Sequence, residues 1–168
     1  MSVSLATCKS RVVLAAARTT ALLIALVLMS ADVAGATTPT KAQFIRQGDA
    51  LCTKTQQELL PIRRQAEAAK SLPASQKWAA ATRVWTLQLQ IQARFNARFR
   101  AIGTPPGDDV ARNLTGGFDR GLLLARRVRN AFAARSTNAL ASALPTYLRF
   151  TISLNRRVAS YGFHVCGR

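Results

Sequence analysis

The feature of this chain that most restricts its fold is a set of apolar residues that recur every three or four positions. The spacing is clearest between residues 108 and 134, where the apolar positions are Val110, Leu114, Phe118, Leu122, Ala125, Val128 and Phe132. This spacing places the apolar side chains on one face of an α-helix, which has 3.6 residues per turn. No stretch shows the strict apolar/polar alternation of a half-buried strand. The pattern therefore predicts an all-α protein.

Four segments have helical spacing, and short stretches with proline, glycine or small polar residues separate them. We expect helices from about Thr40 to a break at Leu72–Pro73, from about Pro73 to Ile102, from about Asp108 to Ala134, and from about Thr137 to Tyr161. Thr40 and Ser71 are the expected caps of the first two. Pro61 is expected to kink or split the first helix, because proline lacks a backbone donor. Pro145 is expected either to kink the fourth helix or to mark its real start. Four helices with short connections predict an up-down-up-down bundle that forms a single domain.

The first 36 residues have the pattern of a secretory signal peptide. Lys9, Arg11 and Arg18 precede an apolar run at 21–29, and the small residues 34–36 follow it. We expect cleavage after Ala36, which leaves residues 37–168 as the mature bundle. The alternative is that residues 12–31 are retained as a membrane anchor, although a spanning helix of that length would bury Arg18.

Export also accounts for the odd number of cysteines. Cys8 would leave with the signal peptide, so the mature chain would carry only Cys52 and Cys166. Exported proteins usually pair such cysteines. In an up-down-up-down bundle the end of the fourth helix lies beside the start of the first, so the topology favours this disulfide. Closing so long a loop contributes about 4–5 kcal/mol in the loop-entropy description.

The residues around the two cysteines resemble those of a group of small exported helical proteins from actinobacteria. Gly48-Asp49-x-x-Cys52 matches the group's early motif, and Tyr161-Gly162-x-x-x-Cys166-Gly167 matches its C-terminal motif. The resemblance spans the mature chain and implies an exported, disulfide-bonded helical protein. It implies no activity. Many members look like lipoproteins, but here no cysteine follows the apolar run directly, so lipidation is not expected.

Arginine dominates the charge of the chain. The sequence holds 24 Lys and Arg against 7 Asp and Glu, a formal net charge of +17. The candidate anion-binding residues are Arg94, Arg98, Arg120, Arg127, Arg149 and Arg156. Because guanidinium groups bind phosphate in a bidentate manner, we expect anionic envelope polymers or an acidic membrane surface as the partner. A coding bias toward arginine is the alternative origin of this excess. Specific nucleic-acid binding is not expected, because no recognition motif is present.

The sequence predicts no catalytic site, metal site or cofactor. Its one histidine, His164, lies two residues from Cys166, which is expected to be in the disulfide rather than a free nucleophile. Two thiols and one histidine also fall short of a zinc site. We therefore expect a non-enzymatic protein that is secreted or held in the cell envelope. The alternative function is a carrier of small apolar molecules, with a pocket between helices lined by Trp78, Trp85 and Phe99. The sequence predicts no oligomeric state.

Overall fold

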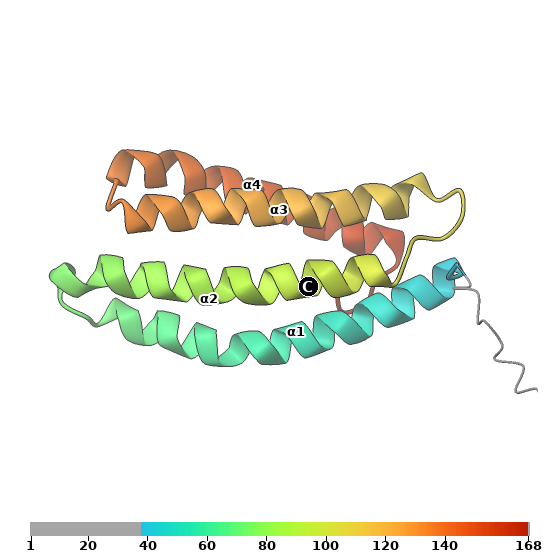
Figure 1. Ribbon diagram of the computed structural model, residues 1–168, viewed down its shortest axis with the longest axis horizontal. Helices are drawn as coiled ribbons and strands as arrows, with labels where there is room; N and C mark the ends of the chain where they lie inside the picture. The colour runs from blue at the N-terminus through green and yellow to red at the C-terminus, as the bar shows by residue number, and fades with distance from the viewer. Residues whose placement is uncertain (1–37, 168) are drawn as a thin grey trace, which may run out of the picture. The chain divides into compact units, whose positions relative to one another are not determined.

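The structure, a computed structural model, describes residues 38–167. They form four helices, α1 (Lys41–Lys70), α2 (Ala74–Ala101), α3 (Asp109–Ala133) and α4 (Thr137–Tyr161). Helix α1 packs on α2, α2 on α3 and α3 on α4, and this part of the chain contains no strand (Figure 1). The predicted all-α four-helix bundle is confirmed. The expected signal peptide and the alternative anchor lie outside the described residues.

Side chains at the helix ends explain where most of the helices begin and stop. Thr40 caps α1 in a capping box with Gln43, and Asp108 and Ser136 accept the backbone N–H three residues ahead in α3 and α4. Gly162 ends α4 in a left-handed conformation with φ 116°, as its position predicted. Ser71 does not cap the second helix, because it ends α1 instead.

The two prolines inside helices do not split them. Pro61 lies within α1 and Pro145 within α4, and α4 begins at Thr137 rather than at the proline. Both prolines are exposed, as are Gln57 and Ala141 one turn earlier. The carbonyl groups that lose a partner can therefore bond to water, which lowers the cost of each proline. The prediction that Pro145 starts its helix is wrong for this reason.

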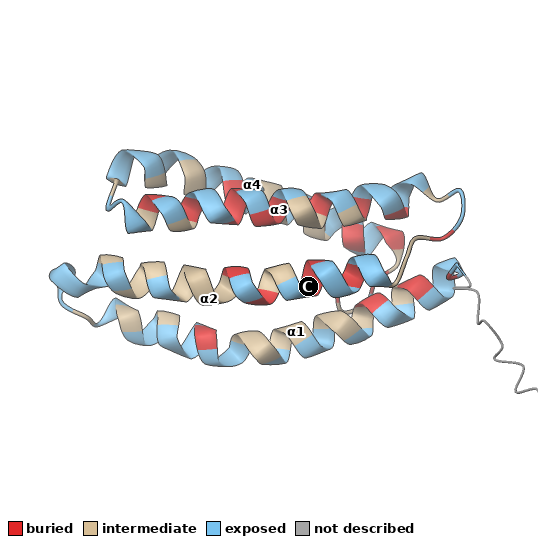
Figure 2. Ribbon diagram, in the orientation of Figure 1, coloured by how far each residue is buried: buried red, intermediate tan, exposed pale blue. Residues whose placement is uncertain are grey.

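Two clusters of buried side chains form the core, and buried residues lie on the inner faces of the helices (Figure 2). The first cluster contains Phe44, Phe99, Tyr161 and Phe163, whose rings meet at centroid distances of 5.2–6.1 Å. This cluster contains residues of all four helices and of residues 163–167, which we call the C-terminal tail. We call this region of the bundle the stapled end. The second cluster, the distal end, draws only on α2, α3 and α4.

The first and last helices are joined through the C-terminal tail rather than along their lengths. Within residues 38–167, the backbones of α1 and α4 do not pack directly on each other. The tail lies between them, with Cys166 bonded to α1 and Gly167 against the backbone of α4 near Asn155. The predicted disulfide forms, but it forms because the tail crosses the space between the two helices.

Candidate anion-binding surface

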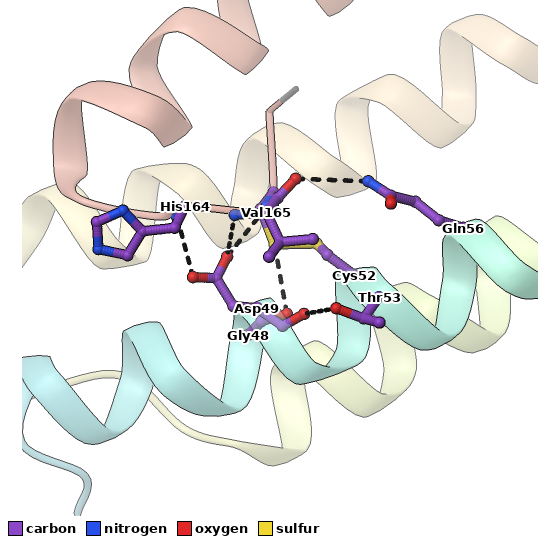
Figure 3. The surroundings of a disulfide bond; sticks show 8 residues. Gly48, Asp49, Cys52, Thr53, Gln56, His164 and Val165 are labelled. Atoms are coloured by element: carbon purple, nitrogen blue, oxygen red, sulfur yellow. Dashed lines mark hydrogen bonds between the residues drawn. A yellow bond between two sulfur atoms is a disulfide. The ribbon is translucent and has the colours of Figure 1, made fainter.

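The tail is fastened to α1 by a disulfide and by one carboxylate. Cys52 and Cys166 are bonded, with their Cα atoms 5.4 Å apart. Asp49 lies one turn before Cys52 and accepts hydrogen bonds from the backbone N–H groups of His164 (2.9 Å), Val165 (2.9 Å) and Cys166 (3.0 Å), as Figure 3 shows. The disulfide is compatible with a location outside the cytoplasm.

The environment of Asp49 favours its charged form. Burial raises the pKa of this carboxyl, but the hydrogen bonds from the three tail amides outweigh burial and hold the pKa below its ordinary value. His164 adds a smaller effect in the same direction. The carboxylate of Asp49 therefore bonds to the N–H groups of the tail, as an N-cap residue does at the start of a helix.

Gly48 is required by the close approach of the tail. A Cβ atom here would overlap the ring of Phe163 and lie 3.0 Å from Phe99. Gly48, Asp49 and Cys52 therefore have three separate tasks on neighbouring turns of α1. Gly48 leaves room for the ring of Phe163, Asp49 bonds to the tail amides, and Cys52 forms the disulfide.

A second carboxylate links α3 to the end of α4. The hydroxyl of Tyr161 donates a 2.5 Å hydrogen bond to Asp108, and Lys41 lies 4.4 Å from the centre of the Tyr161 ring. The bond from Tyr161 lowers the pKa of Asp108, with the N–H of Ala111 acting in the same direction. Burial and the same carboxylate raise the pKa of Tyr161, so the phenol stays protonated. The stapled end is thus held by polar bonds as well as by aromatic contacts.

Two of the six candidate arginines already have a partner inside the protein. Arg94 and Arg98 on α2 bind the two carboxylate oxygens of Glu58 on α1, at 3.1 and 3.2 Å. The hydrogen bond from Arg94, followed by that from Arg98, lowers the pKa of Glu58. These two guanidinium groups join α1 to α2 and are less available to an external anion.

The other four candidates lie on α3 and α4 and are exposed. Among residues 38–167, none of Arg120, Arg127, Arg149 and Arg156 has a carboxylate within ion-pair distance. Arg120 lies 5.4 Å from the centre of the Phe150 ring of α4. The structure therefore separates the six candidates into a paired set on α2 and an unpaired set on α3 and α4.

The carboxylates are distributed unevenly along the chain. Each of the six Asp and Glu residues between 38 and 167 has a partner within the bundle: Asp49, Glu58, Glu67, Asp108, Asp109 and Asp119. All six lie before residue 120. Residues 120–167 contain no Asp or Glu and eight arginines, at positions 120, 126, 127, 129, 135, 149, 156 and 157. This half of the bundle has no acidic side chain of its own to offset its charge.

The unpaired arginines flank exposed apolar side chains in the same pattern on both helices. On α3, Leu123 is 56% exposed and lies between Arg120 and Arg127. On α4, Ile152 is 52% exposed and lies between Arg149 and Arg156. Positions i, i+3 and i+7 lie on one face of a helix. Sequence reasoning did not identify Leu123 and Ile152, although the repeated pattern Arg-x-x-Leu/Ile-x-x-x-Arg was available to it.

The three candidate residues for an apolar ligand do not line one pocket. Phe99 is 1% exposed in the core of the stapled end. Trp85 packs at the distal end against Phe132 and Tyr147, and Trp78 lies beside Phe132 at a shallow hollow. The two tryptophans are thus near each other, while Phe99 lies in a different part of the core.

Among residues 38–167, no three His, Cys, Asp or Glu side chains gather as they would around a metal ion. His164 is exposed, and Cys166 is held in the disulfide. Within the same range, no helix is both long and apolar enough to cross a membrane.

Comparison with models of known protein families, with curated proteins and with solved structures finds no match to this chain. The resemblance in the two cysteine motifs therefore stays a prediction, and the function has to be argued from the surface itself.

Proposed function

We propose that the mature protein is a non-enzymatic bundle that lies outside the cytoplasm and binds anionic components of the cell envelope through α3 and α4. The binding groups are two strips of residues: Arg120, Leu123 and Arg127 on α3, and Arg149, Ile152 and Arg156 on α4. The ligands are phosphate-bearing surfaces, namely acidic phospholipid headgroups or anionic wall polymers.

The observation that carries this proposal is the absence of Asp and Glu from residues 120–167. Solvated surfaces normally intersperse both signs of charge, and an uncompensated excess repels itself. An external polyanion would relieve this repulsion and release counter-ions. Coding bias toward arginine does not by itself explain why every carboxylate lies in the other part of the chain.

The exposed apolar residues favour a membrane surface over a soluble polymer. Arginines that flank an apolar side chain on a helix are typical of segments that lie at a lipid interface, with the apolar group among the acyl chains and the guanidinium groups on the phosphates. Leu123 and Ile152 supply the apolar group of the α3 and α4 strips, respectively. The two strips belong to separate helices, so either can make the first contact.

Vesicle sedimentation tests the proposal directly. The mature protein should bind vesicles that contain phosphatidylglycerol, bind vesicles of neutral lipid weakly, and lose most binding in 1 M NaCl, where the Debye length is about 3 Å. The double variant R149Q/R156Q should lose about 2 kcal/mol of binding, or roughly 30-fold, at about 1 kcal/mol per arginine near an anionic surface.

The matched control is R94Q/R98Q, which removes the same charge from arginines paired with Glu58. We expect it to bind nearly as well as the wild type. Equal losses in the two double variants would mean that only net charge matters and would overturn the assignment to these strips. Purified teichoic acid as a competitor distinguishes wall polymers from lipid.

A further inference from the structure

The space between α1 and α4 contains an open cavity of about 300 Å³. All four helices contribute to its walls, and the tail residues Val165, Cys166 and Gly167 close one end beside the disulfide. This volume is at the lower limit of small-ligand sites in proteins. It has room for about ten groups of the size of a water molecule or a methylene.

The cavity wall changes character along its length. Toward the disulfide it carries the apolar side chains Phe95, Phe118 and Leu154, together with the polar Gln56 and Asn155. Arg63 and Tyr147 lie toward the other end, and among residues 38–167 no other charged side chain lines the wall. Cys52 and Arg63 are eleven residues apart on α1, which corresponds to about 16 Å at 1.5 Å per residue.

An unsatisfied acceptor lies between these two ends. The Oε1 atom of Gln92 is buried and receives no hydrogen bond from any residue in the range 38–167. Gln92 lines the cavity, and its Nε2 atom is close to Gly121 on α3. This oxygen has almost no surface open to the cavity, so a donor in the cavity reaches it only when the Gln92 amide turns toward that donor. Because a buried amide oxygen without a donor is costly, such a bond would stabilise it.

On α1 and α4, exposed apolar side chains lie next to residues of the cavity wall. Leu60 on α1 is 51% exposed and lies one turn from Gln56 and Arg63 of the wall. Leu148 on α4 is 48% exposed and lies one turn before the wall residue Thr151. The mouth therefore offers an apolar surface to an entering ligand.

We infer that this cavity binds a free single-chain hydroxy acid of about ten carbons, whose nine chain carbons and hydroxyl match the cavity volume while the carboxylate lies at the exposed Arg63. Its carboxylate pairs with Arg63, its hydroxyl donates to Gln92 Oε1, and its alkyl chain lies along Phe95, Phe118 and Leu154 toward the disulfide. Within the described residues the wall contains no Asp or Glu, which disfavours a cationic ligand. The volume is too small for a phospholipid with two acyl chains. This binding is separate from the attachment of the α3 and α4 strips to envelope surfaces.

Titration of the mature protein with 3-hydroxydecanoate and with decanoate in 1 M NaCl tests the inference. The high salt suppresses attachment through the surface arginines. Trp85 gives a fluorescence signal, because its ring lies 5.4 Å from that of the wall residue Tyr147, and calorimetry gives the stoichiometry. We expect one site per chain and about two- to ten-fold tighter binding of the hydroxy acid, the range for one net hydrogen bond.

Three variants separate the roles of the wall residues. Q92M keeps the side-chain volume but removes the acceptor, so it should bind both acids equally. At 0.1 M NaCl, where an exposed ion pair is screened much less, R63Q should weaken binding of both acids about two- to five-fold, while R64Q on the neighbouring position should have no effect.

Three results would overturn the inference. If neither acid shows saturable binding, the cavity holds only water. If the preference for the hydroxy acid persists in Q92M, the hydroxyl does not meet Gln92. Vesicles that bind in 1 M NaCl and are released by 3-hydroxydecanoate would show instead that the cavity takes an acyl chain from a lipid. None of these outcomes bears on vesicle binding at low salt, so the two proposals can fail separately.

Discussion

The stapled end and the distal end of the bundle achieve stability in different ways. At the stapled end, α1 contributes Phe44 to a core that also includes the tail, and the disulfide and Asp49 hold the tail in place. At the distal end, α1 contributes no residue to the cluster of buried side chains, which is formed by α2, α3 and α4 alone. The buried core therefore contains side chains of all four helices at the stapled end, but side chains of only α2, α3 and α4 at the distal end.

This difference indicates what the disulfide does for the fold. A four-helix bundle usually buries its first helix against both neighbours, but here α1 packs on α2 and leaves the α4 side to the tail. The covalent bond compensates for contacts that α1 does not make with α4. It also leaves space between the two helices, and that space is the cavity.

The largest expected effect comes from removing the covalent link. The variant C52A/C166A should lose about 4–5 kcal/mol of unfolding free energy, because the unfolded chain gains the freedom of a loop that joins residues 114 positions apart. Urea unfolding measures this loss. Hydrogen exchange should show that protection falls most in α1 and the tail and least in α3.

Reduction of the wild type is the matched control for this variant. Dithiothreitol should lower the stability of the wild type to that of C52A/C166A and leave the variant unchanged. If both cysteines react with an alkylating agent before reduction, the two sulfurs are not bonded. The disulfide would then not explain the difference between the stapled end and the distal end.

A pair of phenylalanine substitutions compares the two ends without touching the disulfide. Phe44 is 0% exposed at the stapled end, and F44A should cost about 3–5 kcal/mol. Phe132 is only half-buried at the distal end, so F132A should cost about 2 kcal/mol, because fewer contacts are lost. Urea midpoints measured on both variants give the ratio. Equal losses would mean that the two ends are equally cohesive.

The sequence was sufficient to predict the helices and the disulfide. The spacing of Val110, Leu114 and Phe118 determines which face of α3 is buried, and this local rule does not depend on the rest of the chain. Cys52 and Cys166 could be paired because export leaves two cysteines in the mature chain. The structure supports both predictions, although the signal peptide on which the pairing rests lies outside the described residues.

The site was less predictable because it depends on which helices touch. The sequence did not reveal that α1 and α4 are held apart. It therefore did not indicate that Gln92 and Arg63 line the same cavity. The predicted pocket instead combined Phe99 with Trp78 and Trp85. The pairing of Arg94 and Arg98 with Glu58 likewise depends on the rotation of α1 about its axis. Helical spacing restricts this rotation but does not fix which charged side chains meet.

The smallest of the three effects tests the hydrogen bonds of the tail. The variant D49N keeps the shape of the side chain but replaces the charged acceptor of three amide hydrogens, and it should cost about 1–3 kcal/mol at pH 7. The same change in Glu67, which forms a surface pair with Lys70, should cost less than about 1 kcal/mol. Chemical unfolding of both variants makes this comparison.

The pH dependence separates the charge of Asp49 from its shape. The pKa of Asp49 is lower in the folded protein than its ordinary value of 3.8, so its carboxylate stabilises the fold fully above that value. This stabilisation is lost as the pH falls through the folded pKa. The gap between wild type and D49N should therefore be widest at neutral pH and should close below about pH 4. A gap that stays constant down to pH 2.5 would mean that the tail amides need only an oxygen acceptor, and the disulfide alone would then distinguish the stapled end.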